Sequence, residues 1–221
     1  MRTLLFIALI SLQVSAHADN RLRYEVTITN ATPGQAFTPQ LIATHARGVA
    51  LFDIGAPAST GLEILAEGGD TAPLTEALRT TRGVGTLQTV PGLLLPGKSV
   101  SVVIETSFFH QHLSIAAMLI PTNDTYVAVS GLRLPAFGEE TVQALAYDAG
   151  TEANDQNCRN IPGPRCGGEG YSPGPNDGDE GFVHVSNGFH ALSPLVDGDV
   201  LAPAHYDWRN PVAIVMVKRL R

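Results

Sequence analysis

Residues 118–152 read MLIPTNDTYVAVSGLRLPAFGEETVQALAYDAGTE and contain the pattern that decides the fold. An apolar run ends at Pro121, the short acidic turn 122–124 follows, and the alternating segment 125–134 leads away. So short a connection between two extended segments predicts a tight antiparallel β-hairpin with the acidic turn at its tip. Gly131 within the second segment indicates a bulge or a close approach by another part of the chain.

A second acidic loop follows the next predicted strand. Asp148 and Glu152 lie four residues apart around Gly150, and glycine lets the backbone curl so that both carboxylates face one point. Asp124 at the hairpin tip joins them if the two loops lie at the same end of the fold. Carboxylates, backbone carbonyls and water are the ligands that Ca²⁺ takes. The residues therefore predict a calcium site, with turn and capping carboxylates that bind no metal as the alternative.

Alternating or continuous apolar runs recur along the rest of the chain and predict further strands. Thr60 and Glu63 fit a capping box that opens a short helix, and a second short helix follows Asp70 or Thr71. We predict an all-β fold, an antiparallel β-sandwich of about eight strands with one or two short inserted helices. The predicted strands cover residues 21–30, 37–44, 86–90, 99–106, 112–121, 125–134, 142–146, parts of 181–190, and 212–217.

Burial can also be predicted from these patterns. Residues 112–121 are apolar on both faces, which is typical of a central strand covered on each side. Phe108, Phe109 and Trp208 are expected in the core because they are large and apolar. Histidine at a strand end and glutamate in a surface helix are usually solvated, so His45 and Glu67 are expected at the surface.

Two of these segments resemble the spondin domain, the module at the front of F-spondin and mindin. PTNDTYVAVSGLRLP is similar to that family's Pro-x-x-Asp-aromatic turn and Val-rich strand, and YDAGTE to its Tyr/Trp-Asp-Ala-Gly-Thr-Asp loop. The first and last predicted strands are also similar. The resemblance implies Ca²⁺ at Asp124, Asp148 and Glu152, although the family usually has Asp at the last position. It further implies adhesion to, or recognition of, an extracellular protein or glycan.

The N-terminal residues predict export. Arg2, the apolar run 4–12 and the small residues around His17 are typical of a signal peptide over residues 1–18, which leaves 19–221 as the spondin-like domain. No other apolar run approaches membrane length, so we expect a secreted or periplasmic protein that does not span the membrane. The formal charge of −7 argues against nucleic-acid binding.

Export also permits a disulfide between the two cysteines. Cys158 and Cys166 flank a segment that can double back through Pro-Gly-Pro, so a bond closing a small surface loop is expected, with free thiols as the alternative.

Two other classes of function remain open at this level. His184, His190 and His205, with His110 or His112, are candidates for a transition-metal site. A hydrolase that uses the carboxylates is the other, but no serine-hydrolase, zinc-protease or phosphate-binding motif is present. We therefore predict a binding domain and not an enzyme.

Overall fold

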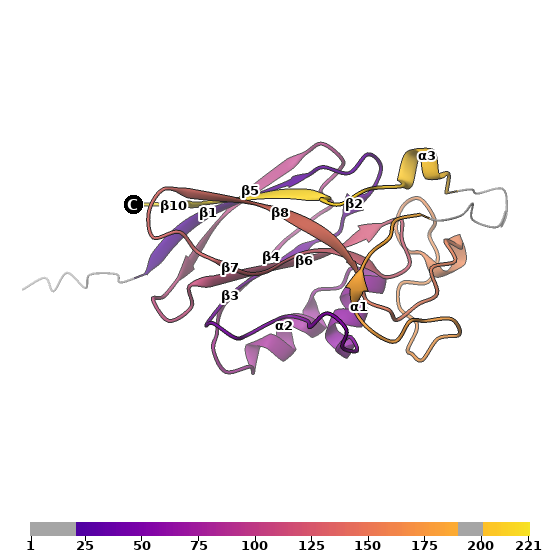
Figure 1. The fold of residues 1–221 in the computed structure, drawn as a ribbon, viewed down its shortest axis with the longest axis horizontal. Coiled ribbons are helices and arrows are strands. Elements are labelled where there is room, and N and C mark those ends of the chain that lie inside the picture. The colour runs from indigo at the N-terminus through magenta and orange to yellow at the C-terminus, as the bar shows by residue number, and fades with distance from the viewer. Residues whose placement is uncertain (1–20, 190–200) are drawn as a thin grey trace, which may run out of the picture.

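The computed structural model describes residues 21–189 and 201–221, and antiparallel strands dominate them (Figure 1). The predicted signal peptide and His190 lie outside the described residues. The strands are β1 Leu22–Asn30, β2 Ala36–Phe37, β3 Gln40–His45, β4 Val84–Val90, β5 Ser99–Thr106, β6 His112–Ile120, β7 Thr125–Arg133, β8 Glu139–Asp148, β9 His184–Val185 and β10 Ala213–Arg219. The helices are α1 Thr60–Gly68, α2 Ala72–Arg79 and α3 Pro203–Tyr206, with the 3-10 turn η1 Cys158–Asn160. The all-β prediction is confirmed.

The strands pair in the order β4-β3-β6-β7-β8-β10-β1-β5, with β2 on β6 and β9 on β8. Strand β8 belongs to both layers of the sandwich, since its first half pairs with β10 and its second half with β7. The predicted hairpin is β6–β7, whose register shifts between Leu113 and Ile115. Gly131 has a φ of +67° at this bulge and donates its N–H to Ser114 Oγ.

Strand β6 is buried on both faces, as its sequence predicts. Leu113, Ile115 and Leu119 point into the core between the two layers. Ala116 lies on the other face of this sheet, which α1 and α2 cover; in Figure 1 this sheet is the lower layer, and the two helices lie below it. Small side chains on that face let a helix approach closely, so the order of the fold is sheet, sheet, helices.

Helix α1 begins one residue earlier than the predicted capping box. Ser59 accepts a hydrogen bond from the N–H of Leu62, and Gly69 ends the helix in the left-handed conformation. Pro73 lies in the first turn of α2, and the Asp70 carboxylate accepts from the N–H of Ala72.

Several burial predictions were wrong, for two reasons: a turn that directs side chains outward, and contacts with distant segments. Phe108 and Phe109 are 64% and 83% exposed because the turn between β5 and β6 projects them outward. His45 is buried and contacts Ser114 Oγ. Glu67 is also buried, because the loop that contains Ser172 covers it, and its carboxylate accepts a hydrogen bond from the N–H of Ser172. Trp208 lies in the core as predicted.

Cys158 and Cys166 form the predicted disulfide, eight residues apart. Among residues 21–189 and 201–221 there is no helix of the length and apolarity needed to cross a membrane.

Candidate metal centre

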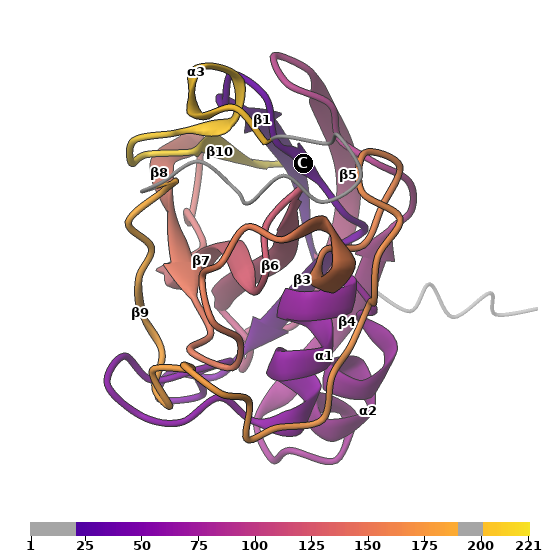
Figure 2. The same cartoon turned by 90° about the vertical axis from the view of Figure 1, so that its right-hand side faces the viewer.

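The sheet register brings the acidic loops together at one end of the sandwich. Asp124 directly precedes β7, and Asp148 is the last residue of β8, where it pairs with Thr125. His184 opens β9 and pairs with Asp148. Antiparallel pairing therefore places three segments, distant in the sequence, side by side. Figure 2 looks onto this end, where the loops after β8 run past α1.

Asp124 is fully buried, and its two carboxylate oxygens have different surroundings. Oδ2 accepts hydrogen bonds from the N–H groups of Thr151 at 2.7 Å and Glu152 at 3.1 Å. Oδ1 is buried with no hydrogen-bond partner. Burial, and then the charge of Asp148, raises the pKa of Asp124 well above its usual value. A buried carboxylate oxygen that has no hydrogen-bond partner and lies beside a second carboxylate destabilises the protein unless it binds a proton or a cation.

Asp148 is almost as deeply buried and has a second set of contacts. Its Oδ1 accepts from the N–H of Gly150 at 2.9 Å and lies 3.4 Å from Nε2 of His184. Nε2 of His184 lies 3.9 Å from Oε2 of Glu180. Burial raises the pKa of Asp148, although the Gly150 hydrogen bond and the nearby His184 oppose that shift.

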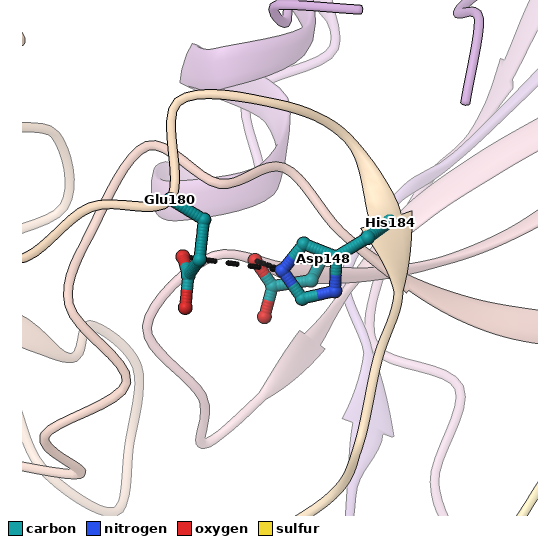
Figure 3. A group of neighbouring side chains, drawn as sticks. All are labelled: Asp148, Glu180 and His184. Atoms are coloured by element: carbon teal, nitrogen blue, oxygen red, sulfur yellow. Dashed lines mark ion pairs between the residues drawn. The ribbon is translucent and has the colours of Figure 1, made fainter. Parts of the chain in front are cut away.

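Figure 3 shows that Asp148, Glu180 and His184 converge, and one ligand atom from each lies within 4.8 Å of the others. The other ring nitrogen of His184, Nδ1, lies 3.1 Å from the carbonyl of Val185. A carbonyl can only accept, so Nδ1 carries a proton, and Nε2 is the ring nitrogen that faces the two carboxylates. When Nε2 carries no proton, it and the two carboxylates present three ligand atoms that suit a divalent cation.

Gly150 shapes the loop between the two sets of ligands. Its φ is +66°, and a Cβ at this position would lie 2.3 Å from the carbonyl oxygen of Phe182. The close approach of these two loops therefore requires glycine here. This agrees with the curled backbone predicted from the sequence.

The Glu152 side chain leaves this centre, although its N–H binds Asp124. Oε1 of Glu152 accepts from Ser172 Oγ at 2.8 Å, while Oε2 is buried without a partner. Ser172 also donates its N–H to Glu67 of α1 at 2.9 Å. Burial raises the pKa of Glu67 to about 7. The cavity beside Glu152 has a volume of about 270 Å³ and an acidic lining that includes Asp155 and Glu169.

The three predicted ligands therefore do not meet at one point: the Glu152 side chain lies apart from Asp124 and Asp148. Asp124 and Asp148 interact electrostatically, and Asp148 alone belongs to the convergent group, which adds Glu180 and His184. Sequence reasoning did not assign Glu180 to this site: residues 176–181 resemble a calcium loop only superficially, and a solvated acidic loop was the preferred interpretation. It named His184 only as part of a histidine site, but His205 lies on α3, and His112 stacks on His45 where β3 and β6 pair.

One comparison with known proteins identifies the chain's relatives. The family model described as Spondin_N matches residues 27–157, which include Asp124, Asp148 and Glu152 but neither Glu180 nor His184. A comparison with curated proteins gave no match. The matched segment runs from within β1 to the loop after β8 and so includes the hairpin and both acidic loops. The chain belongs to the spondin N-terminal domain family.

Proposed function

We propose that this protein is an exported recognition domain of spondin type whose acidic loop end binds Ca²⁺. The observation that carries the proposal is the buried Asp124 carboxylate, whose Oδ1 has no partner although Asp148 lies close by. Calcium takes six to eight oxygen ligands. Asp124 and Asp148 supply two carboxylates, Glu180 supplies a third, and water and backbone carbonyls complete the shell.

The ion's role in this proposal is to brace the loops that meet a partner. Asp124 already ties the loop after β8 to the β6–β7 turn through its bonds to Thr151 and Glu152. An ion on Asp124 and Asp148 adds the segment before β9 to the same cluster. Preorganised loops lose less entropy on binding, which favours recognition of an extracellular protein or glycan. The family and the disulfide both indicate an extracellular protein.

A second candidate ion is a transition metal such as Zn²⁺ on Asp148, Glu180 and His184. The observation that favours it is the position of His184 Nε2 beside both carboxylates, because imidazole suits zinc and is a poor ligand for calcium. The two candidates share Asp148 but differ in their dependence on Asp124 and His184.

Calorimetry with the metal ions alone separates these candidates. We expect Asp124→Asn to weaken calcium binding roughly tenfold or more, and His184→Gln to change it much less. Asp53→Asn, a change of the same kind at an exposed loop position, is the control and should bind as the wild type does. Tight zinc binding that His184→Gln abolishes, with no calcium binding, would assign the centre to a transition metal.

We place the function in binding and not in catalysis. The convergent group has its carboxylates beside an imidazole that already bonds to Val185, and no catalytic motif accompanies them. A screen with glycosidase and esterase substrates should remain negative for the metal-loaded protein. Turnover that Asp148→Asn abolishes and Asp53→Asn leaves intact would show that the protein is an enzyme.

A further inference from the structure

The end of the sandwich opposite the metal centre presents three exposed phenylalanines on two adjacent turns. Phe108 and Phe109 lie between β5 and β6, and Phe137 lies between β7 and β8 and is 86% exposed. The N–H of Leu134 donates to the carbonyl of Gln111 at 2.8 Å and so joins the two turns. This is the end at which the C-terminus is marked in Figure 1. Clustered exposed aromatics of this kind mark an interaction site.

The turn that carries the phenylalanine pair is held by its own hydrogen bonds. The N–H of His110 donates to the carbonyl of Ser107, and the N–H of Phe109 donates to Ser107 Oγ. Gln111 Nε2 donates to the carbonyl of Phe108, and Thr106 Oγ1 donates to that of His110. The exposure of the two rings is therefore a property of an ordered turn, which lowers the entropic cost of binding.

Positive charge lies directly behind these rings. A hollow of about 610 Å³ is lined by Phe108 and Phe109 together with Arg47, Gln111, His112 and Arg133, and none of the described residues that line it is acidic. Burial lowers the pKa of His112, and His45, Arg133 and Arg47 lower it further, so both guanidinium groups act at this hollow. Neither arginine forms an ion pair with a carboxylate within residues 21–189 and 201–221.

Carboxylates also lie at this end, outside the hollow. Glu105 forms ion pairs with Arg21 and Arg23. Glu139 at the start of β8 lies opposite Lys218 of β10, and the exposed Glu140 follows it. In a chain with a formal charge of −7, unpaired cations therefore gather at the hollow behind the phenylalanine pair, whereas the loops around the metal centre carry a cluster of acids.

We propose that this end docks on an anionic lipid membrane, with Phe108, Phe109 and Phe137 inserted at the headgroup–acyl boundary and Arg47 and Arg133 on lipid phosphates. Apolar side chains at the tips of neighbouring turns with arginine behind them match the layering of a bilayer surface, apolar inside and anionic outside. The hollow between the two arginines takes one headgroup. The association is peripheral and does not depend on the metal centre.

Vesicle binding tests the proposal. The protein is mixed in EDTA with vesicles of phosphatidylcholine alone or with about 30% phosphatidylglycerol, and bound protein is measured by flotation. EDTA prevents a metal ion from bridging the acidic end to lipid. We expect binding to the anionic vesicles that weakens with salt, falls about tenfold in Phe109→Ser, and is lost in Arg47→Glu/Arg133→Glu. Ile54→Ser and Arg159→Glu, at exposed positions elsewhere, are the matched controls and should bind as the wild type does.

A fluorescent variant distinguishes insertion from adsorption. The native Trp208 is buried, so Phe109→Trp adds an exposed reporter whose emission should shift to the blue on anionic vesicles. The proposal is overturned if anionic vesicles do not bind the protein, if the control variants lose as much binding as the test variants, or if binding produces no blue shift. Retention on immobilised polyglutamate, with no vesicle binding, would instead assign the surface to an acidic protein partner.

Discussion

Replacing Asp124 by Asn should have opposite effects on stability with and without calcium. The asparagine Oδ1 can accept the N–H bonds of Thr151 and Glu152 that the aspartate now accepts, so the loop contacts remain. The substitution removes a buried, unpaired anionic oxygen and places an N–H donor close to the acidic Asp148. Removing an unsatisfied buried acceptor is worth about 1–3 kcal/mol. Without metal, the variant should therefore melt higher than the wild type, by roughly 2–12 °C.

Calcium should reverse this order. At a concentration of 100 times Kd, an ion that binds only the native state stabilises it by about 2.7 kcal/mol, or roughly 5–10 °C in Tm for a chain of this size. The variant should gain little, because it has lost one charged ligand. Thermal unfolding in EDTA and in excess calcium, followed by circular dichroism, gives the four values required. Asp53→Asn controls for the change of net charge, and it should respond to calcium as the wild type does.

Two results would refute the reasoning. If Asp124→Asn melts well below the wild type in EDTA, the Asp124 carboxylate is satisfied in the metal-free protein, and its Oδ1 is not an empty ligand position. If calcium raises the Tm of the variant as much as that of the wild type, the ion binds elsewhere. The acidic cavity beside Glu152 would then be the first place to examine.

Three further predictions concern the loops around the centre. Gly150→Ala should destabilise the protein by about 1–3 kcal/mol in urea unfolding and weaken metal binding, because the new Cβ meets the Phe182 carbonyl; an unchanged midpoint would contradict this. Cys158→Ser/Cys166→Ser should cost about 2–3 kcal/mol for an eight-residue separation, measured under the same conditions, and reducing agent should affect only the wild type. Glu67 has a folded pKa of about 7, above its unfolded value, so its stabilising contribution is full below pH 4.5 and is lost as the pH rises through 7. Unfolding at pH 5 and pH 8 should therefore show a larger loss of stability in the wild type than in Glu67→Gln, and equal losses would exclude this role.

The sequence predicted the structure best where a local pattern of residues is enough to determine it. The β6–β7 hairpin follows from two apolar runs joined by a short turn, and the bulge follows from Gly131 in the second run. Strand β5 matches its predicted bounds, whereas β8 extends beyond residues 142–146 because it pairs with two different strands, which its polar first residues do not reveal.

The errors concern residues whose burial is set by distant segments or by the geometry of a turn. Glu67 has the sequence context of a surface helix, but residues 170–174 fold over it and Ser172 binds its carboxylate. Phe108 and Phe109 were assigned to the core by side-chain type alone, and a four-residue turn directs them outward. In the metal centre, Asp124 and Asp148 could be predicted to meet because both lie at strand ends. His184 could not, because its pairing with Asp148 depends on the path of a long, irregular segment.

That path also connects the part of the chain that the family model matches with the part that it does not match. The family match ends at residue 157, and the disulfide loop, Glu180 and His184 all lie beyond it. The later segment contacts the matched part at several points, among them Ser172 on Glu67, Asn176 on the carbonyl of Thr151, and His184 on Asp148. These three contacts are made to an acidic side chain or to the loop that binds Asp124. An ion at Asp148 would therefore stabilise the part of the chain that the family model matches and also fix the position of the loops beyond residue 157. Partner recognition through residues 158–184 should accordingly require the metal even where no partner atom touches it.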